Sequence, residues 1–175
     1  FSDNIIGVMI LGLAFTSIYG TKALFFPLIV QSIGIIATLI GVAFMREWKN
    51  PFIGINIPLI VTSIFALIGF YFTSVYYMND INLFYCLTLG LVSSVIVALI
   101  VQYYTGVNQK PVYEIAKSAQ SGAAIDVLAG LAYGLESSIF PILVISAVIL
   151  LSYWISGIYG IAAATIGILA TTGII

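Results

Sequence analysis

The stretch Asn82–Tyr104 reads NLFYCLTLGLVSSVIVALIVQYY and contains no charged residue. About 20 apolar residues in a helix cross the roughly 30 Å of hydrocarbon in a bilayer, and the helix satisfies its backbone hydrogen bonds internally. Membrane β-strands instead alternate polar and apolar residues, whereas this stretch has unbroken apolar runs. It therefore predicts a transmembrane helix.

Similar uncharged stretches lie on both sides of this one, separated by the few charged residues of the chain. We place helices at about 4–20, 23–45, 52–77, 82–104, 136–154 and 157–175, with a loop and helix at about 105–135. The fold class that follows is all-α. We expect residues 1–175 to be a single membrane-integral region, a polytopic bundle of about five to six spans.

The composition agrees with a lipid environment. Of 175 residues, 62% are hydrophobic and only 6% are charged, and the mean hydropathy is +1.23. So few charges cannot cover the surface of a soluble domain of this length. The net charge of −1 gives no reason to expect a nucleic-acid partner. The absence of histidine removes the usual acid-base group and metal ligand at neutral pH.

Cys86 is the single cysteine, so the chain has no intramolecular disulfide and no multi-cysteine metal site. We interpret it as a small apolar core residue. The chain begins without Met, without a basic segment and without a signal-peptide cleavage pattern. We therefore expect it to be an internal piece of a longer protein.

The basic residues predict an orientation, because short cytoplasmic loops are rich in Lys and Arg. Four of the five basic residues fall on one face of the predicted bundle, and they are Arg46, Lys49, Lys110 and Lys117. The loops near 46–51 and 105–135 are therefore predicted to be cytoplasmic, and Asn79–Asp80 to lie outside. Aromatic residues that favour the headgroup region fall at predicted span ends: Trp48, Tyr76, Tyr77, Tyr103 and Tyr104.

Small residues recur at helical spacing in two places and predict close helix packing. Gly130 and Gly134 form a small-x-x-x-small pair. The last predicted hairpin carries a second set, made of Gly157, Gly160, Ala163, Ala164 and Gly167.

Asp126 is the candidate functional residue, because it lies in an otherwise nearly apolar segment on the same helical face as Gly130 and Gly134. An acidic residue within the membrane is often a functional residue. The alternative is that Asp126 is an interfacial carboxylate that contacts lipid headgroups or a neighbouring helix. We expect a structural or coupling role for it. No phosphate-binding loop, zinc motif or pair of acids at helical spacing is present, so we assign no catalytic, cofactor-binding or metal-binding residue.

The run YYTGVNQKPVYEIAKSAQSGAAIDVLAGLAYG at 103–134 resembles the cytoplasmic loop and following helix of membrane-integral, ion-pumping pyrophosphatases. That family reads YYT, then RPV, IA and SQTGPATNIIAGLAVGMEST. The resemblance continues in order through ESS at 136–138, PILVI at 141–145, SGIYGIA at 156–162 and ATTGI at 170–174, and upstream through FPLIV at 26–30. The chain departs from the family pattern at Lys110 for Arg, Ala123 for Pro, Ile125 for Thr and Asp126 for Asn.

The resemblance implies a dimer of sixteen-helix subunits that hydrolyse pyrophosphate with Mg²⁺ and export protons or sodium ions, with K⁺ dependence left open. It places this chain in the outer helical scaffold, between two acid-rich catalytic motifs that the chain does not contain. The implied partners are the lipid bilayer, the remaining helices of the parent protein and a second subunit. The chain alone is expected to be inactive.

Two other functions remain open at this point. Spans interrupted by proline and a lone acid within the membrane, such as Asp126, also occur in secondary transporters. No inverted repeat is evident in this sequence, however. A non-catalytic structural subunit of a membrane complex is the other alternative, because chemically active groups are scarce.

Overall fold

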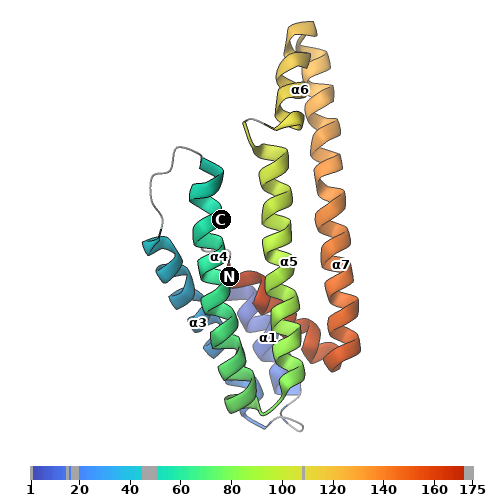
Figure 1. Ribbon diagram of the computed structural model, residues 1–175. Helices are drawn as coiled ribbons and strands as arrows, with labels where there is room; N and C mark the ends of the chain where they lie inside the picture. Colours follow the sequence, from blue (N-terminus) through green and yellow to red (C-terminus); the bar gives the residue numbers. More distant parts are fainter. Residues whose placement is uncertain (1, 15, 17–19, 45–50, 108, 172–175) are drawn as a thin grey trace. The chain divides into compact units, whose positions relative to one another are not determined.

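The computed structural model describes residues 2–14, 16, 20–44, 51–107 and 109–171. Within these ranges every regular element is helical (Figure 1), which confirms the predicted all-α fold class. The elements in chain order are α1 (Ser2–Ala14), α3 (Lys22–Ala43), α4 (Pro51–Phe72), the π-helix η1 (Thr73–Met78), α5 (Ile81–Thr105), α6 (Lys110–Ser118), the 3₁₀ turn η2 (Ala119–Ser121) and α7 (Ala123–Leu169). The predicted border at residues 45–50 lies outside the described ranges.

Four helical stretches of the described chain are long and apolar enough to cross a bilayer. They are Lys22–Ala43, Gly54–Met78, Ile81–Ser121 and Ala123–Leu169, of which Ile81–Ser121 includes the interval between α5 and α6, and a shorter apolar helix covers Ile5–Ala14. The 47 residues of α7 are more than one bilayer crossing requires, and they are divided by a break in helical geometry at Ser156 and Gly157. These helices give the chain the polytopic membrane character that its composition predicts.

The chain divides into two compact units. Unit 1 comprises Phe1–Val95 and Ala147–Ile175, and unit 2 comprises Ile96–Ser146. The helices α5 and α7 each contribute to both units. In unit 1, α3 packs against α1, α4 and η1.

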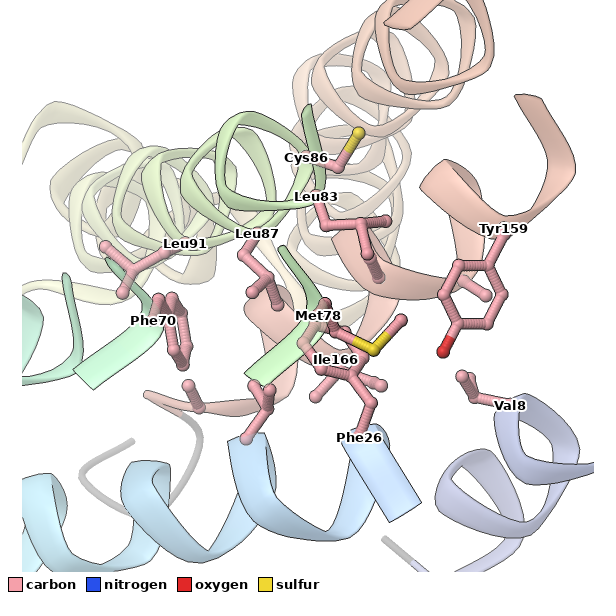
Figure 2. Packing of buried hydrophobic residues seen from close by; sticks show 14 of the residues in the cluster. Val8, Phe26, Phe70, Met78, Leu83, Cys86, Leu87, Leu91, Tyr159 and Ile166 are labelled. Carbon is pink, nitrogen blue, oxygen red and sulfur yellow. The ribbon is translucent and has the colours of Figure 1, made fainter. Parts of the chain in front are cut away.

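The core of unit 1 is built from large apolar side chains of α3, α4, α5 and the end of α7 (Figure 2). Phe26, Phe70, Leu87 and Ile166 are completely buried there. The Tyr159 ring lies beside Phe26 with centroids 6.3 Å apart, and the Tyr159 hydroxyl donates a hydrogen bond to the Ala23 carbonyl at 2.8 Å. In lipid such contacts stabilise mainly through dispersion, because the surrounding acyl chains are as apolar as the core.

Small residues bring α5 and the end of α7 into close contact in unit 1. A side-chain carbon added to Gly90 would collide with the backbone of Ala164, and one added to Gly167 would collide with the backbone of Leu87. Gly160 is similarly enclosed, by the Ser152 carbonyl and the Cys86 sulfur. The predicted close packing of the last small-residue set is therefore confirmed at Gly160 and Gly167.

The helix α7 loses helical geometry at two neighbouring residues. Ser156 has φ −142° and ψ 22°, and Gly157 has φ 63° and ψ −149°. The Gly157 values fall in a region that is essentially restricted to glycine. This break lies next to the border that the sequence predicts between the spans 136–154 and 157–175, and the segment after it returns to the core of unit 1.

Candidate functional site

Unit 2 brings charged and phenolic side chains from three helices together, and we refer to Tyr104, Lys110, Glu114, Tyr133 and Glu136 as the polar cluster. α6 begins at Lys110, and Pro111 occupies its first turn, where a missing backbone donor costs little. Glu114 follows one helical turn later, facing the same side as Lys110. Tyr133 and Glu136 are separated by one turn of α7, so both can face α5 and α6.

Hydrogen bonds connect the three helices through this cluster. The Tyr104 hydroxyl of α5 donates to Glu136 Oε1 of α7 at 3.1 Å. The Tyr133 hydroxyl of α7 donates to Glu114 Oε2 of α6. Lys110 Nζ lies 3.7 Å from Glu114 Oε1. Because the Lys110 side chain is 77% exposed and that of Glu114 is 43% exposed, the ion pair contributes only about 0–1 kcal/mol, and the tyrosine bonds are the main connections.

Asp126, the residue singled out from the sequence, lies at the α6–α7 turn. It is half-buried in the first turn of α7, where a carboxylate complements the positive end of the helix dipole. The Ser118 hydroxyl, at the end of α6, lies 2.7 Å from the Ile115 carbonyl and 3.2 Å from Asp126 Oδ1, so two acceptors share its one proton. Between them the chain reverses at Gly122, whose φ of 121° disfavours other residues. Asp126 thus connects the two arms of the α6–α7 hairpin (Figure 1).

The glycine pair beside Asp126 does not make the expected close helix contact. A side-chain carbon added to Gly130 or Gly134 would meet nothing within 4 Å in the described chain. The physical reason is that this part of α7 exposes most of its circumference within unit 2. Within the described residues this pair therefore makes no close helix contact, and its packing stays a prediction.

Three hollows of the described chain adjoin the polar cluster. The largest, of about 610 Å³, is lined in part by Lys110 and Glu114, and the other two share walls with each other. The smaller of these two, which we call the polar pocket, measures about 140 Å³ and is lined by Tyr103, Tyr104, Lys110, Pro111, Tyr133 and Glu136. The other, which we call the apolar groove, measures about 400 Å³ and is lined by Ile96, Leu99, Ile100, Tyr103, Tyr104 and Phe140. Both are formed within unit 2, and they share Tyr103 and Tyr104 as walls.

Sequence reasoning found the charged segment but not its pairing. In the sequence Glu114 lies three residues from Lys117 and four from Lys110, and the structure places it beside Lys110 and Tyr133. Tyr133 and Glu136 were not singled out. Their spacing of three residues on one helix, opposite a charged loop, was the signal available in the sequence.

The polar cluster does not fit a magnesium site. Mg²⁺ requires near-octahedral oxygen coordination. Here the Glu114 carboxylate already accepts a hydrogen bond from the Tyr133 hydroxyl, and it lies beside the Lys110 ammonium, which would repel a metal cation. Among the residues that the structure describes, no group of three or more His, Cys, Asp or Glu residues is placed to hold a metal ion. The arrangement is suited to holding α5, α6 and α7 together.

Comparison with known proteins gives a match over the whole chain. Residues 1–175 match the family described as inorganic H⁺ pyrophosphatase. The chain is 40% identical to the K⁺-insensitive pyrophosphate-energized proton pump 2 of Moorella thermoacetica, over 97% of this chain and 27% of that protein. It is 32% identical to a protein of Clostridium tetani named as a putative K⁺-stimulated pyrophosphate-energized sodium pump, over 98% of this chain and 27% of the relative.

A third relative is shorter. The pyrophosphate-energized proton pump 2 of Mycoplana dimorpha is 33% identical over 87% of this chain and 81% of its own length. The chain thus spans about a quarter of the length of the longer curated relatives that it matches.

Proposed function

The chain belongs to the inorganic H⁺ pyrophosphatase family, and we propose that it forms part of the outer helical scaffold of a pump that couples pyrophosphate hydrolysis to proton transport. The observation that carries this proposal is the family match over residues 1–175. Relatives that match 97% of the chain are named as pyrophosphate-energized proton pumps. The apolar helices are consistent with this membrane setting.

The scaffold role is supported by what the described side chains do. In unit 1, buried apolar residues and glycine contacts hold helices together. In unit 2, the carboxylates of Glu114, Asp126 and Glu136 accept hydrogen bonds from neighbouring helices or turns. We therefore assign these residues to helix positioning and assign no step of hydrolysis to them.

The remaining properties of the whole pump are part of the same proposal. Mg²⁺ would be held by parts of the protein other than the polar cluster, whose lysine and tyrosine contacts do not suit the ion. The loops near 46–51 and 105–135 would face the cytoplasm, where pyrophosphate is hydrolysed, and two copies of the whole protein would form a dimer. The positive-inside bias of the basic residues supports that orientation.

The test uses the protein expressed together with whatever sequence flanks residues 1–175 in its gene, in membranes that have no pyrophosphatase of their own. Addition of pyrophosphate and Mg²⁺ should release phosphate and acidify the lumen of inside-out vesicles, and a protonophore should collapse the pH gradient. If phosphate is not released, the family activity does not apply to this protein.

Sodium transport is the second candidate, because one relative carries the name of a sodium pump. Uptake of ²²Na⁺ driven by pyrophosphate and resistant to the protonophore would favour it over proton transport. Activity measured with and without K⁺ in the same vesicles would settle the potassium dependence, for which the names of the relatives differ.

A further inference from the structure

The apolar groove and the polar pocket of unit 2 have complementary chemistry. The groove is walled by aliphatic and aromatic side chains of α5 and α7, measures about 400 Å³ and is open rather than enclosed. At the tyrosine pair Tyr103 and Tyr104 it adjoins the polar pocket, which contains one ammonium group and one carboxylate. An apolar hollow next to a charged one fits an amphiphile.

The charged groups of the pocket favour a particular headgroup. The Lys110 side chain is 77% exposed and can donate to a phosphate. The Glu136 carboxylate, held by Tyr104, attracts a cation, and the faces of the tyrosine rings do the same. Lys110 and Glu136 carry +1 and −1, which sum to zero, and nearby Glu114 adds a negative charge. A zwitterionic headgroup therefore fits better than an anionic one.

The walls of the groove favour a flexible chain over a packed helix. Helices in membranes contact one another closely through Gly, Ala, Ser and Thr. The same two helices follow this rule in unit 1, where Gly90 meets Ala164 and Gly167 meets Leu87. In the groove every lining residue is Ile, Leu, Phe or Tyr, and none is a small residue of the kind that lets two helix backbones approach closely. A fatty acyl chain needs no such approach.

We propose that unit 2 binds one phosphatidylethanolamine molecule. One acyl chain lies in the apolar groove against Leu99 and Phe140. The phosphate is bound by Lys110, and the headgroup ammonium lies between Glu136 and the rings of Tyr103 and Tyr104. This lipid site takes no part in pyrophosphate hydrolysis. The proposal depends on insertion of the chain into a membrane and not on the pump function proposed above.

The first experiment measures retained lipid. The protein, with its flanking sequence, is purified from membranes that contain phosphatidylethanolamine, phosphatidylglycerol and phosphatidylcholine, and its bound lipids are counted by native mass spectrometry. Leu99→Trp fills the groove and should lower retention of phosphatidylethanolamine about tenfold, the loss expected when contacts worth about 1.4 kcal/mol disappear. Equal retention by Leu99→Trp and the wild type would overturn the proposal.

Val101→Trp is the matched control. Val101 lies on the same helix with 44% of its surface exposed, against 47% for Leu99, and it does not line the groove. It should retain the lipid as the wild type does. A similar loss in both variants would show that any bulky residue on this part of α5 displaces lipid, and the specific site would be rejected.

The second experiment tests the headgroup. Glu136→Gln removes the charge proposed to hold the ammonium and should abolish the preference for phosphatidylethanolamine over phosphatidylglycerol, while Lys117→Gln should preserve it because Lys117 does not line the polar pocket. Preference for phosphatidylglycerol in the wild type would contradict the proposal. Preference for phosphatidylcholine would assign the pocket to a quaternary ammonium and exclude the ethanolamine headgroup.

The third experiment identifies the occupant of the groove directly. Benzoylphenylalanine replaces Phe140, and ultraviolet light crosslinks it to its neighbour in the intact membrane. A mass increase equal to one phosphatidylethanolamine supports the proposal. A crosslink to another segment of the protein, or to a second copy, would show that a helix covers the groove and would overturn it.

Discussion

At the scale of single residues, Asp126 can be tested through the hydrogen bond that it accepts. Asp126→Ala removes one of the two acceptors that the Ser118 hydroxyl can reach, the other being the Ile115 carbonyl, and should destabilise the α6–α7 turn by about 1 kcal/mol. Asp126→Asn keeps an acceptor oxygen and should cost less. Hydrogen exchange of the amides at 118–126 measures both effects.

The same comparison tests whether Asp126 acts on structure or on chemistry. In the pump proposed above, Asp126→Ala should impair assembly or ion transport more than pyrophosphate affinity. If Asp126→Ala weakens only pyrophosphate or Mg²⁺ binding while the turn stays protected from exchange, the positional role is wrong. Ser118→Ala, which removes the donor, serves as the reciprocal variant.

Glycine positions provide a matched pair for a second prediction. Gly90→Ala places a methyl group against the Ala164 backbone and should destabilise unit 1 by about 1–3 kcal/mol. Gly130→Ala adds the same methyl group at a position where nothing lies within 4 Å. Because alanine has a higher helix propensity than glycine, this change should stabilise α7 by up to about 1 kcal/mol. Thermal unfolding in detergent compares them. Equal melting temperatures would contradict the packing of α5 against α7.

At this scale the sequence could predict interactions between residues that are near one another in the chain. The turn at Gly122 and the acid in the first helical turn are local features, visible in the order of residues. The Tyr133 to Glu114 and Tyr104 to Glu136 bonds join residues 19 and 32 positions apart. Such pairs depend on how helices are placed side by side, which the hydrophobic pattern alone does not specify.

At the scale of elements, the helices followed from the pattern of apolar residues because a bilayer requires long uncharged helical segments. The break in α7 was also readable, since Ser156 and Gly157 fall between two apolar runs. The π-helix η1 was not predicted. Its buried residues include Thr73 and Met78, and no motif in the sequence indicates a π-helix there.

The positive φ of Gly157, at the break in α7, can be tested by substitution. Gly157→Ala forces a side chain into a conformation that costs about 1–3 kcal/mol, so unit 1 should unfold at a lower temperature. Space is not the cause, because nothing lies within 4 Å of the added carbon. Ile158→Ala, an exposed neighbour, should have a much smaller effect. An unchanged melting temperature for Gly157→Ala would show that the break does not need this conformation.

At the scale of the whole molecule, the topology prediction can be tested by cysteine labelling after Cys86 is replaced. Single cysteines at Asn50 and Gln109 should react with impermeant reagents from the cytoplasmic side, and one at Asn79 from the other side, because the basic residues bias the loops near 46–51 and 105–135 inward. Asn79 ends η1 with a positive φ of 54°, typical of a turn. Cytoplasmic labelling of Asn79 would reverse the assignment of spans.

The isolated chain provides a last prediction at this scale. Residues 1–175 expressed alone should need detergent and should not hydrolyse pyrophosphate, because the carboxylates of the polar cluster and of the α6–α7 turn are engaged with tyrosine, lysine and serine. Phosphate release is measured with Mg²⁺ and compared with the longer protein. Magnesium-dependent release by the purified chain would contradict the scaffold assignment.

The bond between Tyr159 and the Ala23 carbonyl has a consequence for biosynthesis. The two residues are 136 positions apart, and the tyrosine is buried in the core that α3 helps to form. During translation, α3 enters the membrane long before Tyr159 leaves the ribosome. Until then, the surface of α3 that Tyr159 later contacts is exposed to lipid. Nascent chains stalled before residue 159 should leave a cysteine at Ala23 open to alkylation, and chains stalled well beyond residue 175 should protect it.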